Sequence, residues 1–120
     1  MLEIIPITAL KDNYIWVLKN NKNRHAVIVD PSEPEPVLKF IKTEGLIPIA
    51  ILITHHHWDH VGGIAGLTSE YNLPVYTPKK ELVKGSTKLL AEGDIVNLPE
   101  LDLNFSVLDV PGHTAGAIAY

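Results

Sequence analysis

Residues 48–60 read Pro-Ile-Ala-Ile-Leu-Ile-Thr-His-His-His-Trp-Asp-His, and this segment is the most informative one in the chain about its fold class. Its first part, Pro48–Thr54, is a continuous apolar run of the kind that forms a strand buried on both faces of a layered α/β protein. The run leads directly into the histidines and an aspartate, and Gly62-Gly63 and a helical pattern over Ile64–Tyr71 follow. A buried strand, a polar turn and a helix in this order predict a site at the carboxyl end of a strand, where open α/β sheets bind their ligands.

The cluster from His55 to His60 has the composition and spacing of a metal site. Residues i and i+2 of an extended segment point to the same side, so His55 and His57 can converge on one ion. Asp59 and His60 lie where the strand turns into the helix, and both can reach a second ion beside the first. Because the chain contains no cysteine, any metal must be held by nitrogen and oxygen ligands.

The alternative for this cluster is a solvated histidine-rich loop or an affinity tag. A tag does not fit, because the cluster lies in the middle of the chain behind a strand of the buried type. An adventitious cluster is not expected to precede Gly62-Gly63 and an amphipathic helix. The surrounding sequence therefore favours the metal site, and the two glycines leave room for backbone and substrate to come close.

The rest of the chain alternates strands with helices, which predicts an α/β layered architecture. A helix is expected after Pro31–Pro36, with Ser32 as its N-cap and Gly45 at its end. Asp30 is interpreted as a buried turn acceptor, and residues 79–93 give no clear pattern. The predicted strands are Leu2–Ile7, Tyr14–Lys19, His25–Asp30, Leu73–Thr77, Asp94–Leu98, Leu103–Val110 and Ala117–Tyr120, of which the second and third form a hairpin across Asn20–Asn23.

Composition excludes several other classes of protein. The 120 residues form one domain at most, and the 46% hydrophobic content is that of a globular protein. A net charge of -4 without a basic run argues against a nucleic acid as partner. The N-terminus does not resemble a signal peptide, and the longest apolar stretch is too short to cross a bilayer. We therefore expect no membrane association and a cytoplasmic protein.

The sequence Thr54-His-His-His-Trp-Asp-His60 resembles the Thr-His-x-His-x-Asp-His signature of the metallo-β-lactamase superfamily. In that superfamily a later histidine from a strand-end loop completes the first metal site. The loop Pro111-Gly-His-Thr-Ala-Gly116 is similar to that one, which places His113 in the role. The resemblance therefore implies that His55, His57 and His113 hold one ion, and that Asp59 and His60 hold part of a second. His25 lacks such a setting and is expected to be a strand or surface residue.

Within the superfamily, two segments resemble hydroxyacylglutathione hydrolase (glyoxalase II). They are Asp12-Asn-Tyr-Ile-Trp16 and Val29-Asp-Pro31 followed by Glu35-Pro-Val-Leu38. This resemblance implies a metal-dependent thioester hydrolase that converts S-(2-hydroxyacyl)glutathione to glutathione and a 2-hydroxy acid such as D-lactate. It implies two divalent ions, zinc first and iron or manganese next, with Asp59 as the catalytic ligand.

Two alternatives stay open. One is another hydrolase of the superfamily, such as a lactonase, a β-lactamase or a nuclease. The other is a non-catalytic fragment that folds and binds metal without turnover.

The family fold is an αββα sandwich of two similar halves, and the resemblance implies that residues 1–120 are the N-terminal part of it. The family's bridging aspartate, its last histidine and its C-terminal helical domain, which supplies most glutathione contacts, follow the Pro-Gly-His-Thr loop. We therefore expect them not to be among these residues, and expect weak or absent activity from the chain alone. The sheet face that meets the other half would then be exposed, with Ile4, Ile15, Val17, Val27, Ile51 and Ile53 on it. Such a face predicts a homodimer.

Overall fold

A six-stranded mixed sheet forms the centre of the molecule in the computed structural model, which describes residues 2–9, 13–54, 61–80, 83–101, 103–109 and 118–120. The strand order is β1-β2-β3-β4-β5-β6, antiparallel over the first three strands and parallel from β3 to β6. Its strands are β1 (Leu2–Ala9), β2 (Asn13–Asn20), β3 (His25–Val29), β4 (Ile47–Leu52), β5 (Val75–Pro78) and β6 (Lys88–Leu90). The predicted strand over residues 48–54 is thus confirmed as β4, a central strand.

Two smaller antiparallel pairs lie beside this sheet. One pairs β7 (Ile95–Leu98) with β8 (Leu103–Ser106), and a short 3-10 helix, η1 (Pro99–Leu101), connects them. The other pairs β9 (Leu108–Asp109) with β10 (Ile118–Ala119). The predicted strand Leu103–Val110 is therefore divided into β8 and β9.

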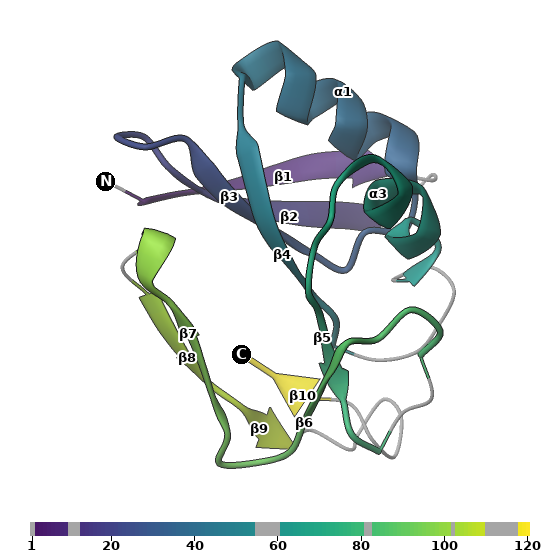
Figure 1. The fold of residues 1–120 in the computed structure, drawn as a ribbon, viewed down its shortest axis with the longest axis vertical. Helices are drawn as coiled ribbons and strands as arrows, with labels where there is room; N and C mark the ends of the chain where they lie inside the picture. Colours follow the sequence, from purple (N-terminus) through teal and green to yellow (C-terminus); the bar gives the residue numbers. More distant parts are fainter. Residues whose placement is uncertain (1, 10–12, 55–60, 81–82, 102, 110–117) are drawn as a thin grey trace.

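Helices α1 (Pro34–Glu44) and α3 (Ile64–Glu70) pack on one face of the six-stranded sheet, and β7–β8 lies on the other (Figure 1). The layered α/β fold expected from the sequence is confirmed. No helix in the described part of the chain is both long and apolar enough to cross a bilayer.

The predicted hairpin is confirmed as β2 and β3, joined by a turn over residues 21–23. The amide of Arg24 donates to the carbonyl of Asn20 at 2.9 Å, and the Oδ1 atom of Asn20 accepts from the amide of Lys22 at 2.8 Å. His25 is the first residue of β3, as expected of a strand residue.

Helix α1 begins one residue later than a Ser32 cap would place it. Glu33 holds the N-cap position in an extended conformation, with no side-chain cap, and Pro34 begins the helix. A proline favours an extended residue before it and suits the first helical turn, so it shifts the boundary past Ser32. The N-cap prediction for Ser32 is therefore wrong, while the predicted stop at Gly45 is confirmed, with φ at 63°.

The core lies on both faces of the sheet. The helix-side cluster joins Val37 and Ile41 of α1 to alternate residues of the central strands, among them Ile15, Val17, Ile28, Ile51 and Ile53. The opposite cluster joins Val27, Ala50 and Leu52 to Val96, Leu98 and Val107 from the β7–β8 side. Side chains alternate between faces along a strand, so β3 and β4 contribute to both clusters.

These clusters correct the expectation of an exposed half-fold face. Ile15, Val17, Val27, Ile51 and Ile53 are all 0% exposed, and only Ile4, at 61%, is open to solvent. Four of the five buried residues pack under the helices, and Val27 packs under the β7–β8 hairpin. The expectation failed for two reasons: four of the residues lie on the face that the helices cover, and the sequence alone did not show that the β7–β8 hairpin covers the other face at Val27.

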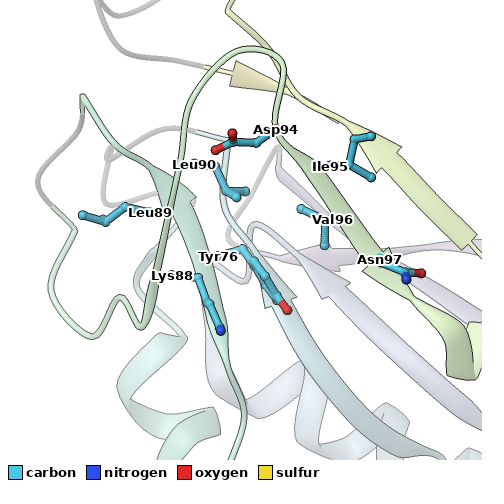
Figure 2. Close-up of a pocket in the computed structure, with 8 residues that line it drawn as sticks. All are labelled: Tyr76, Lys88, Leu89, Leu90, Asp94, Ile95, Val96 and Asn97. Atoms are coloured by element: carbon cyan, nitrogen blue, oxygen red, sulfur yellow. The ribbon is translucent and has the colours of Figure 1, made fainter.

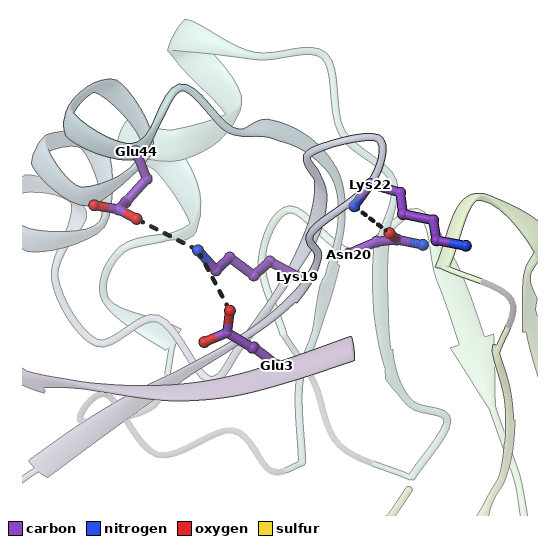
Figure 3. Close-up of polar contacts among 5 residues, drawn as sticks. All are labelled: Glu3, Lys19, Asn20, Lys22 and Glu44. Atoms are coloured by element: carbon purple, nitrogen blue, oxygen red, sulfur yellow. Dashed lines mark hydrogen bonds and ion pairs between the residues drawn. The ribbon is translucent and has the colours of Figure 1, made fainter. Parts of the chain in front are cut away.

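A buried lysine on β2 forms ion pairs with α1 and with β1. The Nζ atom of Lys19, on β2, lies 3.3 Å from a carboxylate oxygen of Glu44 on α1 and 4.0 Å from one of Glu3 on β1 (Figure 3). The Lys19 side chain is 8% exposed, so this pair is less screened by solvent than an ordinary surface pair.

Candidate metal centre

The predicted metal-binding segment begins at the carboxyl end of β4, in the middle of the sheet. Strands β3 and β5 flank β4 on either side, and both run parallel to it. This is the position at which open α/β sheets bind ligands. His55, His57, Asp59 and His60 themselves lie outside the described residues, so their convergence on metal ions stays a prediction.

The start of this segment is fixed by Asp30. Its carboxylate accepts from the amide of Thr54 at 2.8 Å and from the Thr54 hydroxyl at 2.6 Å. Its own amide donates to the carbonyl of Leu52 at 2.9 Å. Asp30 is buried and has a φ of 51°, a left-handed conformation that aspartate tolerates better than most residues. The interpretation of Asp30 as a buried turn acceptor is confirmed.

The end of the segment is fixed by Gly63, which immediately precedes α3. Its amide donates to the carbonyl of Pro31 at 2.7 Å. A Cβ atom at Gly63 would lie 2.8 Å from that carbonyl oxygen and 2.9 Å from the carbonyl carbon of Glu33. The chain after β3 and the chain before α3 therefore touch backbone to backbone, which only glycine allows.

The residues on either side of the predicted loop containing His113 pair with each other, and the chain after it contacts the chain after β4. Asp109 and Ile118 pair across β9 and β10, immediately before and after residues 110–117. The hydroxyl of Tyr120 then donates to the carbonyl of Ile53 at 2.6 Å. His113 itself lies outside the described residues, but the chain on its C-terminal side contacts the chain that leads into His55.

Burial raises the pKa of the Tyr120 hydroxyl, and the nearby Asp30 carboxylate raises it further, while the hydrogen bond to Ile53 acts in the opposite direction. The hydroxyl therefore stays protonated and remains a donor. Tyr120 was not predicted to be a site residue from the sequence. Asp30 was predicted to be a turn acceptor, but its donor, Thr54, was not identified. The partners of Tyr120 are 67 and 44 residues away, so no local pattern announces the contact.

The donor set of the predicted ligands fits a divalent transition metal. Imidazole nitrogen and carboxylate oxygen suit zinc, iron and manganese. Within the described ranges, no three histidine, aspartate or glutamate side chains gather in a way that could hold an ion. The described part of the chain thus offers no competing metal site.

Two cavities lie against the ends of the predicted metal-binding segment. An apolar groove of about 350 Å³ is lined in part by Tyr120 and by Thr54, directly before the segment. A second cavity, of about 320 Å³, is lined in part by Val61, directly after the segment. The first groove is lined by Ile4, Trp16, Leu18, Val29, Leu52, Thr54, Phe105 and Tyr120.

A third cavity, of about 370 Å³, lies between β5–β6 and β7 (Figure 2). Its lining includes Tyr76, Lys88 and Asp94 but no residue next to the predicted ligand segments. Of these three cavities, the one with the greatest volume is therefore not one of the two beside the predicted metal-binding segment.

The sequence pattern of the Metallo-beta-lactamase superfamily matches residues 10–119, almost the whole chain. The chain belongs to this superfamily. Among curated relatives it is 52% identical over 120 residues to the hydroxyacylglutathione hydrolase of Nitrosomonas eutropha (strain DSM 101675 / C91 / Nm57) and 54% identical over 120 residues to that of Pectobacterium carotovorum subsp. carotovorum (strain PC1). These matches cover 100% and 99% of this chain but 46% and 47% of the relatives. The chain thus spans about half the length of the curated relatives it matches.

Solved structures agree with the fold. BLEG-1 B3 metallo-beta-lactamase matches with a TM-score of 0.82 and 28% identity, over 98% of this chain and 65% of that one. TTHA1623 in a di-iron-bound form matches with a TM-score of 0.72 and 31% identity, over 95% of this chain and 64% of that one. The expected metallo-β-lactamase fold, over its N-terminal part, is confirmed.

Proposed function

We propose that these residues form the N-terminal, metal-binding part of an enzyme that hydrolyses S-(2-hydroxyacyl)glutathione thioesters to glutathione and a 2-hydroxy acid. The observation that carries the proposal is the identity of 52% and 54% to two hydroxyacylglutathione hydrolases over the whole chain. Identity to the β-lactamase BLEG-1 is lower, at 28%. The relatives' names therefore favour a small-molecule thioester, and a cytoplasmic setting is proposed with it.

Two divalent ions are proposed as cofactors, with His55, His57 and His113 on one and Asp59 and His60 on the other. The structural neighbour TTHA1623 was solved in a di-iron-bound form, which supports a two-metal site for this fold. Bound metals would lower the pKa of water toward neutrality and stabilise the charge that develops on the thioester carbonyl oxygen.

The described residues on either side of the predicted ligand segment fix where that segment begins and ends. Asp30 fixes the beginning of the segment through Thr54, and Gly63 fixes its end against Pro31. A catalytic group displaced by about 1 Å can cost about 10²-fold in rate, so the placement of these two ends matters to the chemistry. Among the described residues, those that line the apolar groove reaching Thr54 and Tyr120 carry no charge.

A hybrid enzyme tests the proposal. Residues 1–120 replace the matched part of the Nitrosomonas eutropha relative, and turnover of S-lactoylglutathione, a lactone and a β-lactam is compared. We expect turnover of the thioester above both others. We also expect His57→Ala to lower it at least about 100-fold, because a catalytic zinc site needs its three protein ligands. The control His25→Gln, outside the predicted cluster, should keep the rate. Preference for the lactone or the β-lactam would reject the thioester assignment.

For the 120-residue chain alone, we propose a homodimer formed through the exposed apolar residues of β1 and β2. Ile4, Tyr14 and Trp16 are 61%, 54% and 42% exposed, and Ile4 and Trp16 line the apolar groove next to Thr54. Burying this patch against a second copy is expected to cover at least about 1,200 Å² in total.

Sedimentation at micromolar concentration should show this dimer, and the double variant Ile4→Lys/Trp16→Lys should sediment as a monomer. The control Ile47→Lys replaces an isoleucine that is 51% exposed at the start of β4, outside the groove lining, and should leave the dimer intact. A wild-type chain that sediments as a monomer would contradict this proposal.

A further inference from the structure

The peptide unit between Ile53 and Thr54 is held at both of its polar ends. Its N–H group donates to the Oδ1 atom of Asp30 at 2.8 Å, and its carbonyl accepts from the Tyr120 hydroxyl at 2.6 Å. This unit directly precedes His55, the first predicted ligand. Asp30 follows β3 and Tyr120 follows β10, so the unit joins two distant segments of the chain.

The carbonyl of Ile53 needs a donor from outside the sheet. Along the parallel pair β4–β5, the amides of Ile51 and Ile53 donate to the carbonyls of Pro74 and Tyr76, at 3.0 and 2.8 Å. In a parallel ladder, the residue two positions beyond each acceptor donates back. For Ile53 that residue is Pro78, which has no N–H group. The Tyr120 hydroxyl supplies the donor that the sheet lacks at this point.

Tyr120 is well placed for this contact. Its ring packs edge-on against Phe105, with centroids 6.3 Å apart and an interplanar angle of 85°. Its hydroxyl also lies 3.3 Å from the carbonyl oxygen of Tyr76, the same carbonyl that accepts from Ile53. The hydroxyl therefore sits between the carboxyl ends of β4 and β5.

We propose that Tyr120 is a positioning residue that fastens the chain following His113 to the peptide unit preceding His55, and so sets the distance between the two groups of metal ligands. The inference rests on the proposed metal centre. The same hydrogen bond that completes β4 would join two ligand-bearing segments that are more than 50 residues apart in sequence.

The test compares Tyr120→Phe with the matched control Tyr76→Phe, which removes a phenolic oxygen from the neighbouring tyrosine but keeps the main-chain carbonyl. Cobalt(II) affinity is measured by absorption titration, and amide hydrogen exchange at Ile53, Thr54 and β10 is measured by NMR on metal-free protein. We expect Tyr120→Phe to weaken cobalt binding about 10-fold, the scale for losing a group that orients a ligand. Exchange at these amides should become about 3- to 10-fold faster. Tyr76→Phe should change neither.

The double variant Tyr120→Phe/Pro78→Ala separates positioning from simple completion of the sheet. An alanine at residue 78 restores an N–H group facing Ile53, so exchange at Thr54 should recover while cobalt affinity stays low. Recovery of both, or an unchanged cobalt affinity in Tyr120→Phe, would overturn the proposal. If the wild-type chain binds no cobalt, the proposed metal centre fails. The role of Tyr120 in spacing metal ligands then fails as well, and exchange at β10 decides only whether the Tyr120 hydroxyl links the two segments: faster exchange in Tyr120→Phe supports the link, and unchanged exchange overturns it.

Discussion

A polypeptide of these 120 residues, supplied with zinc, is expected to hydrolyse S-lactoylglutathione at least about 10³-fold more slowly than the hybrid enzyme, and far below the roughly 10 per second of a typical enzyme. By resemblance, the family's bridging aspartate and last histidine follow the Pro111–Gly116 loop. The acidic residues in the C-terminal third of the chain all precede His113, namely Glu81, Glu92, Asp94, Glu100, Asp102 and Asp109. The second ion would then keep Asp59 and His60 alone, fewer than the three protein ligands of a catalytic zinc site.

The measurement is thioester cleavage by the isolated chain and by the hybrid under the same zinc concentration. The isolated chain carrying His57→Ala serves as the background. Turnover near 10 per second by the 120 residues alone would show that the chain completes its site in another way.

The second large effect is expected from Gly63→Ala. The added Cβ would lie 2.8 to 3.0 Å from three backbone atoms of Pro31 and Glu33, none of which can move like the end of a side chain. Overpacking of this kind costs about 3 kcal/mol or more when the neighbours are rigid. The melting temperature should then fall by roughly 10 °C.

Thermal unfolding followed by circular dichroism measures this loss. Ala65→Ser is the control, because Ala65 is an exposed residue of α3, the helix that follows Gly63. We expect it to stay within about 0.5 kcal/mol of the wild-type stability. A Gly63→Ala chain as stable as this control would mean that α3 is not held against the segment after β3.

Local pattern was sufficient for most of the fold. The apolar run over residues 48–54 predicted β4, and the polar turn between two β-branched segments predicted the β2–β3 hairpin. Strand β6 was missed, because its three residues, Lys88–Leu90, are too few for a period-2 pattern to stand out. The cap at Ser32 was misplaced, since the proline at position 34 outweighs a good capping side chain.

The packing of distant segments against one another could not be predicted from the sequence. Val27 alternates correctly along β3, but nothing in its neighbourhood shows that Val96 and Leu98 cover it. Likewise, the Thr54–His60 motif predicted where the site begins. The bond from Tyr120 to Ile53 joins residues 67 apart and depends on the register of β4 against β5. Pro78 was the available signal, because a proline in a strand leaves a neighbouring carbonyl without its donor.

The zinc affinity of the 120-residue chain and of its histidine variants shows whether the predicted metal centre exists. We expect one tightly bound zinc ion per chain, held by His55, His57 and His113. Both His57→Ala and His113→Ala should weaken it at least about 100-fold, since even a group that only orients a ligand contributes about 10- to 100-fold. His25→Gln should bind zinc as the wild type does. Equal zinc affinity in the wild-type, His57→Ala and His113→Ala chains would contradict the metal centre on which the proposed function depends.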